Sequence, residues 1–159
     1  MQMSDVSESL IVYFSASGNT KSAAEKISRQ TQAEVLAIQP ATPYPEAYED
    51  LATVGKKEID EQILPDLAPL PMNLNAYQTI YLGFPIWWDQ PPMLVARFLK
   101  EKGLVNKRVI VFATSYSSTI DNSLQVLKKW TENTAVEILG GFLANNEQEI
   151  QTGLASWTD

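Results

Sequence analysis

The segment that most constrains the fold spans residues 11–21, where an apolar, aromatic run changes abruptly to small hydroxyl residues, a glycine and an asparagine. A helical pattern begins directly afterwards with Ala23, Ala24 and Ile27. This order indicates a buried strand, a tight loop and the start of a helix. Backbone N–H groups at a helix start lack intrahelical partners, and the helix dipole makes that end positive. Together with the loop hydroxyls, these groups can bind a phosphate.

An ordinary capped turn is the alternative interpretation of this loop, because Ser, Asn and Thr are common helix N-caps and Gly is a common turn residue. A cap needs one hydroxyl, whereas the loop carries three hydroxyls, an amide and a glycine within six residues. This crowding favours a phosphate site. The loop consists of Ser15, Ala16, Ser17, Gly18, Asn19 and Thr20.

Composition narrows the chemistry that the chain can perform. Its 159 residues, 45% hydrophobic and 19% charged, are typical of a globular protein with one good core, so we expect a single domain over residues 1–159. Cysteine and histidine are absent, which removes thiolate chemistry, disulfides and the commonest general base and metal ligand. We therefore expect no metal site, and a cofactor that brings its own chemistry is favoured.

Charge and hydropathy limit the partners and the compartment. A net charge of −7 disfavours nucleic acid and anionic membrane surfaces as partners. The first eight residues lack the basic start and apolar stretch of a signal peptide, and no run approaches the length of a membrane span. We therefore expect a cytoplasmic protein, either a monomer or a homodimer.

The alternation of apolar and helical segments predicts the fold class. Strands are expected at residues 10–14, 34–38, 79–84, 108–113 and 135–139. Helices are expected at 19–30, 46–62 and 93–100, with two more on the core faces Leu124, Leu127, Trp130 and Ile150, Leu154, Trp157. This pattern predicts a doubly wound α/β sheet, whose ligands bind beyond the carboxyl ends of the strands.

Residues 41–72 differ from the rest of the chain. They hold five of the nine prolines, and seven acids face two lysines there. We interpret this segment as a surface excursion between the second and third strands that includes a helix with a mostly solvated face. It is either a partner surface or a feature that keeps the protein soluble.

Three chemically rich loops follow strand ends, and together they suggest a ligand. The loop at residues 15–20 suits a phosphate, and residues 85–89, with two adjacent tryptophans, offer flat apolar faces for a planar ring. Residues 114–119 offer hydroxyls, backbone donors and Tyr116. This set fits FMN better than ATP, which needs a Gly-x4-Gly-Lys-Ser/Thr loop. Either tryptophan could instead be core, although adjacent residues of an extended stretch cannot both point inward.

The six-residue loop at 15–20 resembles the FMN-phosphate loop of the flavodoxins, whose usual form is Ser/Thr-x-Ser/Thr-Gly-Asn-Thr after the first strand. Residues 81–88 and 39–45 are similar to a subgroup of short, stand-alone flavodoxin-like proteins, in which a strand ends in Gly-x-Pro-Ile-Trp-Trp. The resemblance covers nearly the whole chain. It implies a five-stranded parallel sheet of order 2-1-3-4-5 with helices on both faces, which would bring the three loops together.

The resemblance also implies FMN as cofactor and assigns its contacts. The phosphate would be bound by Ser15, Ser17, Gly18, Asn19 and Thr20. The ring would be lined by Pro85, Ile86, Trp87 and Trp88 on one side and by Thr114, Ser115 and Tyr116 on the other. Two departures concern the ring and its potential: Asp89 stands where the subgroup usually has a small residue, and residues 114–118 replace a His-Gly-Gly-rich loop. We include Asp89 in the site and expect it to help lower the flavin potential.

Two functions follow from the resemblance. The first is an electron carrier that docks on redox partner proteins. The second is an FMN-dependent NAD(P)H:quinone-type oxidoreductase that reduces small acceptors, although longer relatives of that kind build the site with insertions that this chain is too short to contain. A receiver-like signalling domain would need an acidic cluster at the end of the first strand, where Phe14 and Ser15 stand.

Overall fold

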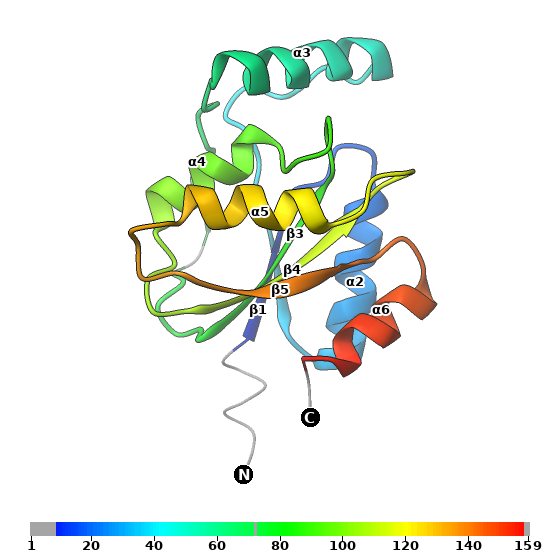
Figure 1. Ribbon diagram of the computed structural model, residues 1–159, viewed down its shortest axis with the longest axis vertical. Coiled ribbons are helices and arrows are strands. Elements are labelled where there is room, and N and C mark those ends of the chain that lie inside the picture. Colours follow the sequence, from blue (N-terminus) through cyan, green and yellow to red (C-terminus); the bar gives the residue numbers. More distant parts are fainter. Residues whose placement is uncertain (1–8, 72, 158–159) are drawn as a thin grey trace.

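The computed structural model describes residues 9–71 and 73–157, which form a parallel β-sheet flanked by helices (Figure 1). In sheet order the strands are β2, β1, β3, β4 and β5, and every neighbouring pair runs parallel. Their bounds are β1 Ser9–Tyr13, β2 Glu34–Ala37, β3 Thr79–Pro85, β4 Arg108–Thr114 and β5 Glu137–Leu143. The predicted five-stranded order 2-1-3-4-5 is confirmed.

Helices cover both faces of this sheet. The helices of the described residues are α2 Asn19–Thr31, α3 Tyr48–Glu61, α4 Met93–Lys102, α5 Asp121–Trp130 and α6 Glu147–Ala155. Helices α2 and α6 lie on one face, and α4 and α5 lie on the other (Figure 1). Along β1, Ile11 packs with the α2 and α6 side, whereas Leu10 and Val12 pack with the α4 and α5 side. Because both faces are covered, the strands are apolar at consecutive positions.

The predicted end of the fifth strand was wrong. The strand was expected to end at residue 139, before Gly140 and Gly141, but β5 continues through them to Leu143. A Cβ at Gly141 would lie 2.5 Å from the backbone oxygen of Val111, so this strand needs glycine for its close approach to β4. Trp157, expected on the last helix, follows the end of α6 and packs against the core beside it. The other stated bounds agree within one or two residues.

The segment between β2 and β3 forms an arm that carries α3 beyond the carboxyl ends of the strands (Figure 1). Its two ends meet at the base, where the Ala41 N–H donates to the Asp66 carbonyl over 2.8 Å and the Ala68 N–H donates to the Gln39 carbonyl over 2.9 Å. The guanidinium of Arg97 on α4 lies 2.6 Å from the Asp66 carboxylate. The arm is therefore closed and tied to α4, and α3 is held near the carboxyl edge of the sheet.

None of the helices within the described ranges has both the length and the apolar character that crossing a membrane requires.

Candidate functional site

A cavity of about 670 Å³ lies at the carboxyl edge of the sheet and joins the three predicted loops. Nine of the predicted site residues line it: Ser17, Asn19, Pro85, Ile86, Trp87, Trp88, Thr114, Ser115 and Tyr116. The other four, Ser15, Gly18, Thr20 and Asp89, are not among its lining residues. The structure thus brings the three loops together, while the role of each residue as a ligand contact stays a prediction.

Sequence reasoning missed half of the walls of this cavity. The residues that it did not anticipate come from the first loop, from α2, from α3 and from the chain after β5: Ala16, Ser22, Ala23, Lys26, Tyr48, Leu51, Ala52, Ala144 and Asn145. Asn145 was missed because the fifth strand was ended too early, so that the residue was not recognised as following a strand. Residues of α3 were missed because nothing in the sequence of the predicted surface excursion indicated that its helix would line a cavity.

The first loop leaves the start of α2 without a side-chain cap. Gly18 is the N-cap, with a left-handed φ of 98°, and it makes no side-chain cap hydrogen bond. Its N–H donates instead to the Ser15 hydroxyl oxygen over 3.1 Å. The starts of α3, α4 and α5 also lack a side-chain cap, whereas the Asn146 side chain caps α6 by accepting from the Glu149 N–H. An uncapped, positively polarised helix start that faces a cavity suits an anion better than the capped-turn interpretation does.

A buried pair of hydroxyls joins the first and third loops. The Thr20 and Thr114 Oγ1 atoms lie 2.8 Å apart in a hydrogen bond, and both side chains are buried. The first turn of α2 is therefore fixed to the carboxyl end of β4. Thr20 contributes here as a link between elements, with Thr114 as the member of the pair that lines the cavity.

The third loop is fastened to the end of β5. The Ser115 N–H donates to Oδ1 of Asn145 over 2.8 Å, and the Ser118 N–H donates to the Ser115 hydroxyl over 2.8 Å. These bonds leave Tyr116 at the tip, where its side chain is 96% exposed while still lining the cavity. The loop thus supplies a fixed polar wall and one exposed aromatic side chain at the mouth.

The tryptophan segment makes a tight turn at residues 87–90. The Trp87 N–H donates to the Gln90 carbonyl over 2.9 Å, and the Gln90 N–H donates back over 3.1 Å. Trp88 and Asp89, the central residues, have positive φ of 51° and 67°. This is the pattern of a type I′ turn, in which Asn-Gly is usual and tryptophan carries a steric cost. The Asn122 side chain supports the turn by donating to the Asp89 carbonyl over 2.7 Å.

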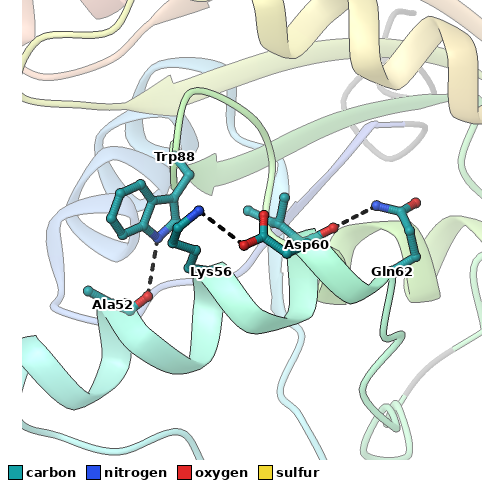
Figure 2. A network of polar contacts seen from close by, with 6 residues as sticks. Ala52, Lys56, Asp60, Gln62 and Trp88 are labelled. Carbon is teal, nitrogen blue, oxygen red and sulfur yellow. Dashed lines mark hydrogen bonds and ion pairs between the residues drawn. The ribbon is translucent and has the colours of Figure 1, made fainter.

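Both tryptophans contact α3 as well as the cavity. Trp87 is partly buried, and a Cβ at Gly55 of α3 would lie 3.0 Å from its ring. Figure 2 shows Trp88 beside α3, where its indole N–H donates to the Ala52 carbonyl over 3.2 Å. The Lys56 ammonium lies 5.3 Å from the centre of the Trp88 ring. As expected for adjacent residues, one of the two is exposed: Trp88, at 54%.

An aromatic cluster behind Trp87 holds the inner side of α3. Its ring meets those of Phe14 and Tyr44 nearly at right angles, with ring centres 5.5 and 5.3 Å apart. Tyr44 also hydrogen-bonds Glu58 of α3, whose carboxyl group is buried. Burial raises the pKa of Glu58, because a charged carboxylate is poorly solvated there. This helix therefore forms a packed wall of the site.

The lining of the cavity contrasts in charge with the whole chain. The protein has 19 acidic residues against 12 basic ones, yet among the described residues that line the cavity the single charged side chain is that of Lys26. The rest of the lining consists of apolar aromatic side chains, a wall of hydroxyl groups and the uncapped start of α2. These features fit a ligand with a planar ring and an anionic group. Within the described residues no three His, Cys, Asp or Glu side chains lie close enough together to hold a metal ion.

The sequence from residue 8 to residue 159 matches the family model for flavodoxin. No curated protein matches it. A solved candidate flavoprotein from Bacteroides eggerthii is 32% identical, the match covers 92% of this chain and 94% of that chain, and the TM-score is 0.81. A candidate flavoprotein from Bacteroides uniformis is 30% identical over 92% of this chain and 96% of that chain, with a TM-score of 0.79.

A flavoprotein from Lactobacillus acidophilus, solved in complex with FMN, has the same fold. It is 20% identical, the match covers 96% of this chain and 99% of that chain, and the TM-score is 0.81. At this identity the likeness concerns the fold.

Proposed function

This chain belongs to the flavodoxin family, and on that premise we propose that it binds FMN in the cavity at the carboxyl edge of the sheet and carries electrons between redox partners. The observation that carries the proposal is one cavity in which an uncapped helix start, aromatic side chains and a hydroxyl wall meet. The FMN complex of the Lactobacillus acidophilus structure supports the choice of ligand. When bound, the flavin ring supplies the electron chemistry, and the protein sets its affinity and potential.

The residues of this chain divide the binding task between two ends of the cavity. At one end, backbone N–H groups at the start of α2, with Ser17 and Asn19, hold the phosphate. At the other, the segment at residues 85–88 and the wall of α3 offer apolar surface to the ring, while residues 114–116 offer polar groups. Apolar walls exclude water from the ring, which makes nearby charges act more strongly on its reduction.

The first test of the proposal is the visible spectrum of the purified protein and an FMN titration of the apo form. We expect a flavin spectrum, and weaker binding in Asn19→Ala, which removes a side chain from the cavity lining. Gln30→Ala, exposed on the same helix outside the lining, is the control and should bind as the wild type does. A colourless protein that does not bind FMN would reject the proposal.

Kinetic measurements distinguish the proposed electron carrier from the alternative, an FMN-dependent oxidoreductase. The photoreduced holoprotein should pass electrons to a small one-electron acceptor, whereas steady-state mixing with NAD(P)H and a quinone should give no turnover above that of free FMN. Turnover well above free FMN would replace the carrier role with that of an oxidoreductase and leave FMN binding in place.

A further inference from the structure

Asn145 stands where the chain leaves the carboxyl end of β5, and it lines the cavity beside the third loop. In the sheet, β5 is three strands from β1, a separation of about 14 Å between the two strands. The predicted phosphate loop follows β1, whereas Ser115 of the polar wall follows β4, the neighbour of β5. Asn145 therefore belongs to the side of the cavity that lies away from the end of β1.

The backbone of Asn145 is fixed by the first turn of α6. Its N–H donates to Oε1 of Glu149 over 2.8 Å. The Glu149 N–H donates in turn to Oδ1 of Asn146, the N-cap residue of the helix, over 2.9 Å. These two bonds join Asn145 to α6, so the start of the helix sets the position from which its side chain extends.

The side-chain amide of Asn145 is held in one orientation. The Ser115 N–H donates to its Oδ1 atom over 2.8 Å, and only the oxygen of an amide can accept such a bond. The NH₂ group is therefore left as a donor, and it bonds to no acceptor within residues 9–71 and 73–157, which the structure describes. Because Asn145 is exposed and lines the cavity, this group is free to meet a ligand there.

We propose that the NH₂ group of Asn145 donates a hydrogen bond to the riboflavin part of FMN, which makes Asn145 a binding residue of the flavin site. This inference rests on the proposed binding of FMN. The ring carbonyls and ribityl hydroxyls of a flavin accept hydrogen bonds. Bonds from Ser115 and to Glu149 already fix both the side chain and the backbone of this donor, so it loses little conformational freedom on binding.

Asn145→Asp separates flavin binding from the attachment of the third loop. Aspartate keeps an oxygen that accepts from the Ser115 N–H, but it replaces the NH₂ donor with a charged acceptor. Riboflavin, which has no phosphate, is the main probe, and dissociation constants for riboflavin and FMN are measured by flavin fluorescence. The variant should bind riboflavin about tenfold more weakly, because an acceptor then faces an acceptor and neither is satisfied.

Asn146→Asp is the matched control. It adds the same charge at the next residue, it lies outside the cavity lining, and aspartate still caps α6 by accepting from the Glu149 N–H. Its riboflavin affinity should stay within about twofold of the wild-type value, because an exposed charge is screened by salt.

A second measurement uses the wild-type protein and keeps the inference testable if Asn145→Asp folds poorly. In ¹⁵N spectra, the side-chain NH₂ resonances of Asn145 should shift when FMN or riboflavin binds. Those of Asn133, which is exposed before the amino end of β5, should stay in place.

Three results would overturn the inference. These are equal riboflavin affinities in Asn145→Asp and Asn146→Asp, a loss in Asn145→Asp that is confined to FMN, or NH₂ resonances of Asn145 that do not move on binding. In each case FMN would still bind to the wild type and the proposed function would stand. Absence of FMN binding to the wild type would instead reject the proposed function itself.

Discussion

The hydroxyl of Tyr44 donates a 2.8 Å hydrogen bond to Oε1 of Glu58, a residue that is only 8% exposed. The Tyr44 ring packs in turn on Phe14, which follows β1, and on Trp87, which lines the cavity. This bond therefore connects α3 to the core of the sheet and to the candidate flavin site. A change in the charge of Glu58 should therefore change the stability of the packing between α3 and the sheet.

The first prediction concerns pH and Glu58. Burial raises the pKa of this carboxyl above its ordinary value of 4.5, although the hydrogen bond from Tyr44 acts in the opposite direction. A raised pKa in the folded state means that the contribution to stability is complete below pH 4.5 and is lost as the pH rises through the raised value. Glu58→Gln keeps Oε1 as an acceptor and cannot ionise, so its Tm relative to the wild type should increase over that range.

The control for this prediction is Glu61→Gln, an exposed position on the same helix. Its Tm should follow that of the wild type at every pH, so that the difference isolates the buried group. A Glu58→Gln variant whose relative Tm falls as the pH rises would contradict the sign of the pKa shift.

The second prediction tests the packing of the sheet at Gly83. A Cβ at this position would lie 2.1 Å from the Phe112 ring, which is fully buried on the neighbouring strand. Because the ring occupies the space of a side chain, Gly83→Ala should reduce the free energy of unfolding by about 1–3 kcal/mol, as overpacking does. Urea unfolding measures this loss.

A double mutant separates overpacking from other effects of the new methyl group. Phe112→Leu removes the clashing ring, so the loss in Gly83→Ala with Phe112→Leu should be smaller than the sum of the two single losses. Additive losses would mean that the ring does not press on this position.

The third prediction concerns the potential of the bound flavin. Apolar walls and a net charge of −7 disfavour negative charge on the reduced ring, so bound FMN should be harder to reduce than free FMN. Asp89→Asn removes a charge beside Trp88 and should raise the potential, whereas Glu137→Gln, at the amino edge of the sheet, should leave it unchanged. Redox titration measures both, and a bound flavin reduced as easily as free FMN would refute the expectation.

The sequence could predict what depends on local chemistry. The strand, loop and helix around Gly18 follow from an apolar run that stops at a glycine whose left-handed φ of 98° suits that residue. Continuous apolar strands likewise follow from a sheet covered on both faces. The strand order was inferred from the family resemblance, since alternation of segments by itself does not order strands within a sheet.

Contacts between distant segments could not be predicted. Gly55 gives no sign in the sequence that it faces Trp87, and Tyr44 gives none that it bonds Glu58, so the helix in the acidic segment looked like a solvated surface. At the end of β5 the predicted strand stopped before Gly140 and Gly141, yet close packing on β4 requires Gly141 within the strand. The role of Asn145 was missed through the same error.

The last prediction concerns the attachment of α3 at its first turns. Trp88→Phe keeps an aromatic ring beside Lys56 and removes the indole N–H that donates to Ala52 (Figure 2). Loss of one hydrogen bond should cost about 0.5–1.5 kcal/mol of local stability. The amides of α3 should therefore exchange hydrogen faster, with those of α6 unchanged, and FMN should bind less tightly because α3 lines its cavity. Trp130→Phe, on α5 and outside the lining, is the control. Wild-type exchange in α3 together with wild-type FMN affinity would mean that this indole does not hold the helix at the site.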